Sequence, residues 1–269
     1  MDAYCDTASG RLHYRVDGPE DGPPLLMSNA LGTTLELWSA QAERLQRRFR
    51  VVRYDTRGHG RSSAPAGEYT LDELGEDALR VLDAAGAETA HVCGISLGGL
   101  TAMWLGVHHP SRVQDLVVAD TAARVGTTER WVERAARARA EGMTAIADLN
   151  MPNWFTPEYR EREPATVARF HRMVASCSVE GYAGCCAALR DADLRPVIKS
   201  VGARTLVVAG DRDPSTTVAD AELICRDIPG ATLVILGAAH LSNVECADSF
   251  SSHLETFVGV APRHSGASS

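Results

Sequence analysis

Short apolar runs alternate with longer amphipathic segments along most of this 269-residue chain. The apolar runs have the length of buried strands, and the segments between them repeat apolar residues at helical spacing. This alternation predicts an α/β fold in which a mostly parallel sheet is flanked by helices. The predicted strands are 11–16, 25–29, 51–55, 90–95, 116–120, 205–209 and 232–236, and the predicted helices are 36–48, 71–85, 97–109, 219–227 and 247–258.

One long segment lacks any strand pattern. Between residue 121 and about residue 200 the sequence is helical or irregular, which predicts a helical cap inserted between two strands. We expect a core of residues 1–123 and 200–262, a cap (lid) of residues 124–199, and a flexible tail, 263–269, of small and polar residues. Because open α/β sheets bind ligands at the carboxyl ends of their strands, the cap should cover the functional site.

Composition and charge narrow the class of protein. Hydrophobic residues make up 45% and charged residues 23% of the chain, which is typical of a globular protein. The formal net charge of -8 disfavours a nucleic-acid or anionic-membrane surface, and no run of about 20 apolar residues could span a bilayer. Seven cysteines without a CxxC pair, and an N-terminus without a signal-peptide pattern, lead us to expect a cytoplasmic protein with reduced thiols.

A nucleophilic serine is indicated by the pattern GxSxG. The run Gly94-Ile95-Ser96-Leu97-Gly98 follows a predicted buried strand and opens a predicted helix. A serine held on such a tight strand-to-helix turn needs neighbours that are nearly free of side chains, and the glycines at both ends of the run provide them. We therefore expect Ser96 to be a catalytic nucleophile rather than part of a simple turn.

A serine hydroxyl needs a base, and the base needs an orienting acid. His240 follows the last predicted strand, in a loop that can bring its imidazole over Ser96. Two aspartates, Asp211 and Asp213, follow the strand before it. We favour Asp213, because Pro214 after it disfavours helix and fixes a loop that can present the carboxylate, whereas Asp211 could instead cap the turn or pair with Arg212.

An oxyanion formed in acyl transfer needs preorganised donors. One is the backbone N–H of Leu97, the residue after the nucleophile. The second should come from the loop after the strand 25–29, where the offset points to Ala30, with Leu31 as the alternative. The glycine-rich run 54–62 lacks the GK[ST] element of a phosphate loop, so we expect it to be a rigid structural turn.

At this point the motifs resemble those of a known family. DxRGHGxS, GxSxGG and the late DP…H pair are similar to α/β-hydrolase signatures, and a narrower resemblance to the 3-oxoadipate enol-lactonases runs through SNALGTTLELW, DTAARVGTTERW, GYAGCCAALRDADLR and AAHLSNVE. The resemblance implies the α/β-hydrolase fold, with an eight-stranded type of sheet and an inserted helical cap. It also implies hydrolysis of a small anionic enol lactone by a Ser-His-Asp acyl-enzyme mechanism, without a cofactor or a metal.

An anionic substrate requires a cationic clamp near the cap. Arg124, where the chain leaves the sheet, is our first candidate and Arg190 is the second, although each has acidic residues with which it could pair. Trp131 and Trp154 are candidates for the walls of the pocket. Four further arginines, in a segment where arginines and alanines interleave, are expected to form a solvated helix face: Arg130, Arg134, Arg137 and Arg139.

Two rival functions stay open at the level of the sequence. The same machinery serves carboxylesterases and lactonases of other specificity, and only the cap segments argue against them. A non-catalytic ligand-binding protein on the same scaffold is disfavoured by the complete set Ser96, Asp213 and His240. The sequence is compatible with a homo-oligomer but does not specify one.

Overall fold

A mixed eight-stranded sheet forms the centre of the molecule in a computed structural model that describes residues 2–259. The strand order is β1-β2-β4-β3-β5-β6-β7-β8. β2 pairs antiparallel with both of its neighbours, and the other strands pair parallel. The strands are β1 Asp2–Thr7, β2 Gly10–Asp17, β3 Pro24–Ser28, β4 Arg50–Tyr54, β5 Ala90–Ile95, β6 Val113–Ala119, β7 Arg204–Gly210 and β8 Thr232–Leu236.

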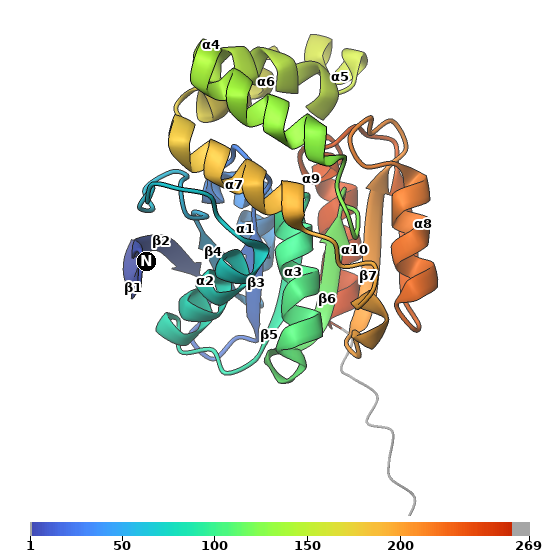
Figure 1. Cartoon of the computed structure of the whole chain (residues 1–269). Helices are drawn as coiled ribbons and strands as arrows, with labels where there is room; N and C mark the ends of the chain where they lie inside the picture. The colour runs from blue at the N-terminus through green and yellow to red at the C-terminus, as the bar shows by residue number, and fades with distance from the viewer. Residues whose placement is uncertain (1, 260–269) are drawn as a thin grey trace, which may run out of the picture.

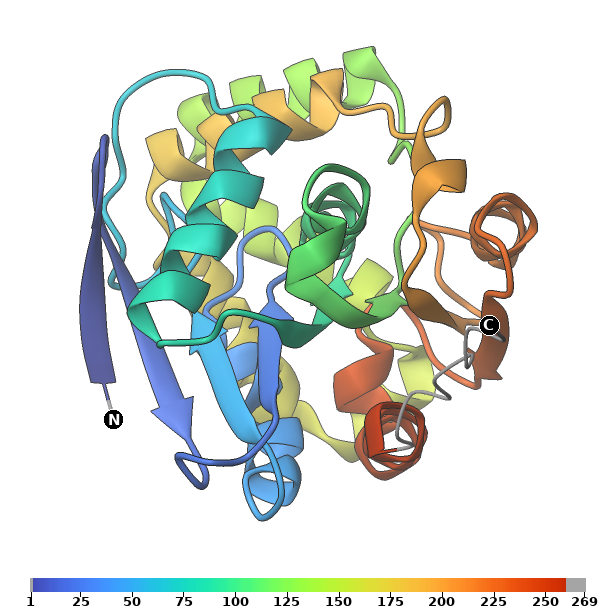
Figure 2. The same ribbon diagram turned by 90° about the horizontal axis from the view of Figure 1, so that it is seen from below.

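Helices cover both faces of this sheet (Figures 1 and 2). α1 (Ser39–Leu45) and α10 (Ala247–Gly259) pack together on one face, whereas α2 (Leu71–Ala84), α3 (Leu97–His108) and α8 (Val218–Asp227) cover the other. α3 is apolar and buried on nearly all sides, because it contacts the sheet, the neighbouring helix α2 and the 3₁₀ turn Ile198–Ser200. The short helices are α9 Ser242–Glu245 and the 3₁₀ turns Leu35–Trp38, Pro110–Arg112 and Ile198–Ser200.

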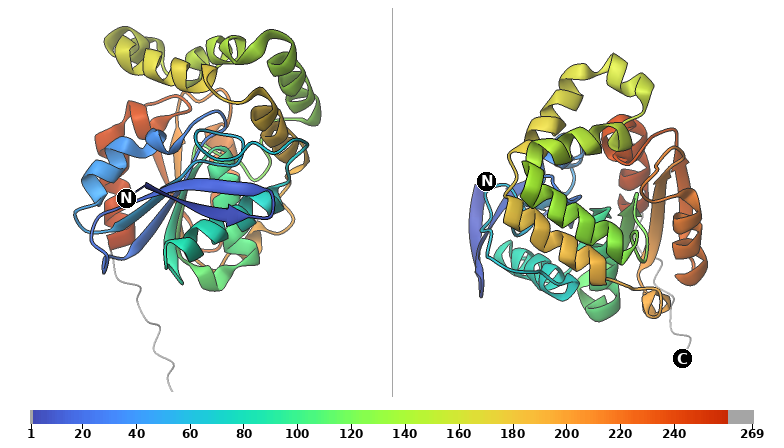
Figure 3. Two further views of the ribbon diagram at one scale, coloured as in Figure 1. Left: turned by 90° about the vertical axis from the view of Figure 1, so that its left-hand side faces the viewer. Right: turned by 45° about the horizontal axis from the view of Figure 1, so that its top comes forward.

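Four helices form a layer over one end of the sheet (Figure 3). They are α4 Thr128–Trp154, α5 Pro157–Arg162, α6 Pro164–Ala175 and α7 Val179–Asp191, and they connect β6 to β7. α4 bends sharply at Gly142, whose φ is 79°, so it consists of two helical segments. The Leu194 N–H donates to the Ala123 carbonyl at 2.8 Å. The two ends of this inserted layer therefore meet at one point of the core.

The predicted architecture of a mostly parallel sheet flanked by helices is confirmed, and each of the seven predicted strands is present. The sequence pattern missed β1, because its residues DAYCDT lie on an edge strand and none of them is fully buried. The four helices of the inserted layer fall inside the segment 124–199 that we expected to be a cap. The predicted tail, 263–269, lies outside the described residues, as do positions 260–262 of the expected core.

No helix in the described part of the chain is long and apolar enough to cross a membrane.

Candidate active site

The turn between β5 and α3 holds Ser96 in a strained conformation. Its φ of 56° and ψ of -118° lie outside the regions that non-glycine residues usually occupy. The glycines on either side permit the turn. A Cβ on Gly94 would lie 2.0 Å from the Gly98 carbonyl oxygen, and a Cβ on Gly98 would lie 2.2 Å from the Ser28 carbonyl oxygen. The GxSxG spacing is therefore imposed by the close approach of three backbone segments.

Ser96, His240 and Asp213 form a hydrogen-bonded chain. The Ser96 Oγ lies 3.0 Å from His240 Nε2, and His240 Nδ1 lies 2.7 Å from Asp213 Oδ2. These distances fit a neutral imidazole that accepts from the serine hydroxyl and donates to the carboxylate. All three residues are buried, and they come from the ends of β5, β7 and β8. Asp211, the alternative acid, lies instead at the surface, with a carboxylate oxygen 3.6 Å from the Arg212 guanidinium.

The Asp213 carboxylate is fixed by neighbours other than His240. It accepts hydrogen bonds from the Ser215 N–H at 2.7 Å, the Thr216 N–H at 3.2 Å and the Thr216 hydroxyl at 2.6 Å. Burial acts to raise the pKa of Asp213, but the charge and hydrogen bond of His240, with these donors, lower it overall. Burial likewise acts to lower the pKa of His240, and the charge and hydrogen bond of Asp213 raise it overall. The pair thus favours an ionised acid that can stabilise an imidazolium.

Three backbone N–H groups are available above Ser96. Within residues 2–259 the N–H groups of Leu97, Ala30 and Leu31 donate no hydrogen bond. Leu97 is the first residue of α3, so its N–H also carries the positive end of the helix dipole. Ala30 and Leu31 line the same cavity as Ser96. This arrangement can hold an oxyanion between Leu97 and the loop after β3.

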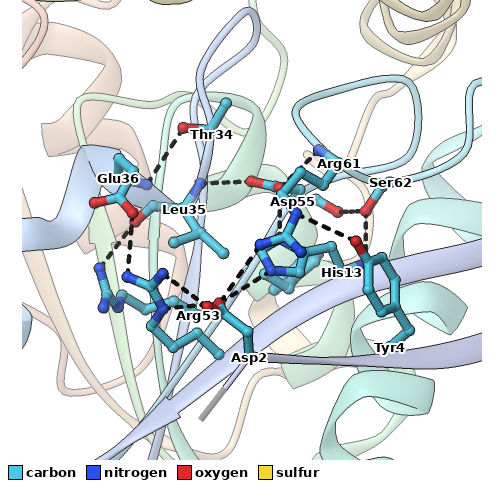
Figure 4. Close-up of polar contacts among 12 residues, drawn as sticks. Asp2, Tyr4, His13, Thr34, Leu35, Glu36, Arg53, Asp55, Arg61 and Ser62 are labelled. Atoms are coloured by element: carbon cyan, nitrogen blue, oxygen red, sulfur yellow. Dashed lines mark hydrogen bonds and ion pairs between the residues drawn. The ribbon is translucent and has the colours of Figure 1, made fainter.

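Side chains of the segment 54–62 accept hydrogen bonds from the loop after β3 and fix its backbone (Figure 4). The Gly32 N–H donates to His59 Nε2 at 2.9 Å. The Leu35 N–H donates to Asp55 Oδ1 at 2.8 Å, as Figure 4 shows. The other oxygen of Asp55 accepts from the Arg61 N–H and lies 2.8 Å from His13 Nδ1. The run 54–62 is therefore a structural support for the loop, and not a phosphate loop.

A cavity lies between the sheet and the inserted helices. Ser96 and His240 form part of its floor, and Trp131, Trp154 and Tyr182 form apolar walls. Both tryptophans that the sequence offered as candidates for the pocket walls therefore line this cavity. The complete lining is Ala30, Leu31, Ser96, Ser215 and His240 from the core, and Val125, Arg130, Trp131, Arg134, Asn150, Asn153, Trp154 and Tyr182 from the segment that follows β6.

Two arginines of α4, Arg130 and Arg134, give the cavity its positive charge. The Arg134 guanidinium is held by the Tyr182 hydroxyl at 2.8 Å and by the Asn150 side-chain oxygen. The Arg130 guanidinium has no ion pair and donates no hydrogen bond within the part of the chain that the structure describes; it lies over the Trp131 ring, 5.4 Å from the centroid. Burial lowers the pKa of Arg130, and so does the charge of Arg134. Arg130 is therefore a half-buried cation without a counter-ion.

The two arginines favoured by the sequence lie elsewhere, which corrects that expectation. Arg124 faces a separate surface groove and lies 3.5 Å from Asp193. Arg190 pairs with Glu68 at 2.8 Å and with Asp191 at 2.7 Å. Neither lines the cavity above Ser96. Their acidic neighbours already neutralise them, so neither has a free charge for a substrate.

The expectation of a solvated arginine face on α4 is half wrong. Arg137 and Arg139 are exposed and pair with Glu141 and Glu180, but Arg130 and Arg134 line the cavity. The sequence contained a signal that Arg134 faces inward. It lies three residues after the buried Trp131 and four before the buried Ala138, so the three share one helix face.

No group of three or more His, Cys, Asp or Glu residues in the described chain could hold a metal ion.

The chain is similar in sequence and in structure to proteins of one known family. Residues 23–246 match the family model described as alpha/beta hydrolase fold. The chain is 44% identical over 244 residues to 3-oxoadipate enol-lactonase 2 of Acinetobacter baylyi, covering 91% of each chain, and 38% identical over 247 residues to enol-lactonase 1 of that organism, covering 92% of each. The crystal structure of the enol-lactonase from Burkholderia xenovorans LB400 matches with a TM-score of 0.94 and 42% identity, over 96% of this chain and 100% of that one. The similarity therefore extends through the sheet and the inserted helices alike.

Proposed function

The chain belongs to the α/β-hydrolase family and, within it, to the 3-oxoadipate enol-lactonases, and from this premise we propose that it hydrolyses 3-oxoadipate enol-lactone to 3-oxoadipate with Ser96 as the nucleophile. The observation that carries the proposal is the hydrogen-bonded chain Ser96–His240–Asp213 on the floor of a cavity that holds an unpaired arginine.

The first half of the reaction opens the lactone ring. The Ser96 Oγ attacks the lactone carbonyl carbon while His240 Nε2 takes the hydroxyl proton. The carbonyl oxygen becomes an oxyanion that the Leu97 N–H and the N–H of Ala30 or Leu31 stabilise. The bond between the carbonyl carbon and the ring oxygen then breaks, and His240 returns its proton to that oxygen. The product of this half is an acyl-enzyme that carries an enol.

The second half releases the product. The enol tautomerises to a ketone, and His240 takes a proton from a water molecule that attacks the acyl carbon. The second tetrahedral oxyanion uses the same backbone donors. When it collapses, the carbon–Oγ bond breaks and His240 returns the proton to Ser96, which restores the enzyme and leaves a free carboxylate. Asp213 holds the imidazole in one orientation throughout and stabilises its charged form.

Arg130 binds the carboxylate that the lactone carries. Three features support this role: its side chain lines the cavity, it is half-buried, and no acidic residue forms an ion pair with it in the described structure. Arg134 adds positive charge from one helical turn away, but Tyr182 and Asn150 already hold its guanidinium. A planar guanidinium can bind a carboxylate through two parallel hydrogen bonds, which would fix the lactone with its carbonyl over Ser96.

The test is kcat/KM for 3-oxoadipate enol-lactone, a neutral butyrolactone and a p-nitrophenyl ester. We expect the wild type to prefer the carboxylated lactone strongly. Arg130→Gln should lower that kcat/KM by about 10- to 100-fold, the loss expected for one charged hydrogen-bonded contact, and should leave the neutral substrates nearly unaffected. Arg137→Gln is the matched control, because Arg137 lies on the same helix but pairs with Glu141 at the surface.

Ser96→Ala tests the nucleophile separately. Its kcat should fall by roughly 10⁴- to 10⁶-fold, because the rest of the triad contributes little without it. Wild-type preference for the neutral ester would contradict the enol-lactonase function and leave a carboxylesterase of other specificity. Failure of a fluorophosphonate probe to label Ser96 would instead favour a ligand-binding protein without catalysis.

We also place the enzyme in the cytoplasm. Its seven cysteines are all free thiols, and three of them, Cys93, Cys185 and Cys186, are fully buried. Burial raises the pKa of the Cys93 thiol well above its usual range. Buried neutral thiols of this kind are typical of proteins from a reducing compartment.

A further inference from the structure

Asp120 is a buried carboxylate beside the triad that the mechanism above does not use. Asp120 directly follows the last residue of β6 and is only 1% exposed to solvent. Its φ of 41° is left-handed, and Ser96 is the only other non-glycine residue in positions 2–259 with a positive φ. A non-glycine residue in this backbone conformation is strained unless its surroundings stabilise it.

Both carboxylate oxygens of Asp120 accept backbone hydrogen bonds. Oδ1 accepts from the Gly210 N–H at 2.8 Å, and Oδ2 accepts from the Ser242 N–H at 2.9 Å. Gly210 ends β7, three residues before Asp213, and Ser242 begins α9, two residues after His240. One side chain therefore connects the loop that carries the acid to the loop that carries the base.

The charges around Asp120 involve both of the catalytic residues that it connects. Burial and the charge of Asp213 raise the pKa of Asp120 to about 7, although the charge of His240 and hydrogen bonding by Ser242 act to lower it. The Asp120 charge in turn raises the pKa of His240, and Arg130 on α4 acts on His240 in the opposite direction. Cys246, after α9, is the other titratable neighbour, and burial, followed by acidic charges that include Asp120, raises its pKa. A second negative charge near the imidazole would favour the imidazolium that forms during acyl transfer.

We propose that Asp120 is a positioning residue of the hydrolase: its carboxylate fixes the acid loop and the base loop relative to each other, and its charge, when ionised, acts on His240. The proposal rests on the triad of the proposed function. It gives a reason for the left-handed backbone, because that conformation places one carboxylate between the two N–H groups. An asparagine could not replace it, since its NH₂ group would face one of those donors.

The test compares Asp120→Asn with Asp115→Asn. Asp115 is a second buried carboxylate on β6, but it pairs with Arg204 and His91 at the start of the strand. Asp120→Asn should lower kcat about 10- to 100-fold with little change in KM. It should also move the acidic limb of the kcat/KM profile to lower pH, because loss of the Asp120 charge disfavours the imidazolium. Asp115→Asn should lower the Tm without moving that limb.

A second pair of variants keeps Asp120 in place, in case Asp120→Asn does not fold. Ser242→Pro removes the N–H that donates to Oδ2, and proline is tolerated at the first position of a helix. Ser242→Ala keeps that N–H and removes only the side-chain hydroxyl. We expect kcat to be clearly lower in Ser242→Pro than in Ser242→Ala.

The outcomes separate this inference from the proposed function. An unshifted pH profile in Asp120→Asn, with activity lost only in proportion to Tm as in Asp115→Asn, would overturn the positioning role. Equal kcat values in the two Ser242 variants would also overturn it. Neither result would affect the triad, which fails only if Ser96→Ala retains activity close to that of the wild type.

Discussion

His59 shows how a single buried imidazole can be confined to one protonation state. Its Nδ1 lies 3.1 Å from the Arg57 carbonyl oxygen, so that nitrogen must donate, and its Nε2 accepts from the Gly32 N–H, so that nitrogen must carry no proton. Burial lowers the pKa of His59, which favours this neutral form. Protonation would remove the acceptor that holds the loop after β3, where the oxyanion donors Ala30 and Leu31 lie.

We therefore expect His59→Leu to lower kcat by about tenfold or more, as partial loss of an oxyanion donor does, with a smaller effect on KM. His59→Gln should recover part of the activity, because its amide oxygen can accept from Gly32. Steady-state kinetics at the pH optimum test both variants. Equal activity in the two would show that the imidazole only fills space.

His59 also contributes to the pH dependence of stability. Because its pKa is lower in the folded state, its contribution is fully present above the ordinary value of 6.5 and is lost as the pH falls from there toward the lowered value.

Arg130 affects the chemistry as well as binding, since its charge lowers the pKa of His240. Arg130→Gln should therefore move the acidic limb of kcat/KM to higher pH, the direction opposite to that expected for Asp120→Asn. The neutral p-nitrophenyl ester is the substrate to use, because its binding does not involve the guanidinium. A limb that stays at the wild-type pH would show that Arg130 lies too far from His240 to influence its titration.

At the scale of elements, α7 can pack closely against the core only because Gly181 has no side chain. A Cβ on Gly181 would lie 2.3 Å from the Gly58 carbonyl oxygen, which belongs to the turn that supports the loop after β3. The next residue, Tyr182, lines the cavity and hydrogen-bonds Arg134. The packing of α7 thus affects both the support of the oxyanion loop and the wall of the site.

Gly181→Ala should destabilise the protein by about 1–3 kcal/mol, because the added methyl group overpacks this contact. It should also raise KM for the lactone by displacing Tyr182. Gly202→Ala is the control, since a Cβ there meets nothing within 4 Å. Thermal unfolding and kinetics of the two variants test this, and an unchanged Tm in Gly181→Ala would mean that α7 moves away without cost.

The sequence predicted the sheet better than the site, for a physical reason. Strands buried on both faces, such as β5, read as continuous apolar runs wherever they lie in the sheet. The pattern also located Ser96, Asp213 and His240, because each lies in the turn or loop that follows a strand, and parallel strands end at one edge. The cap arginines could not be assigned in this way. Helical periodicity shows that Arg134 shares a face with Trp131, but it does not show whether that face covers a closed core or a cavity.

At the scale of the whole molecule, the cap is an insertion whose two ends meet. The hydrogen bond from Leu194 to Ala123 closes the base of the cap, while the triad lies on the strand ends and its connecting loops. An exchange of the intervening segment in evolution would leave the strand order and the three catalytic positions where they are. Most of the cavity wall and the three catalytic residues therefore lie on separate stretches of the chain, so a replacement of the segment between these two adjacent ends could change the wall without changing the strands that carry the triad.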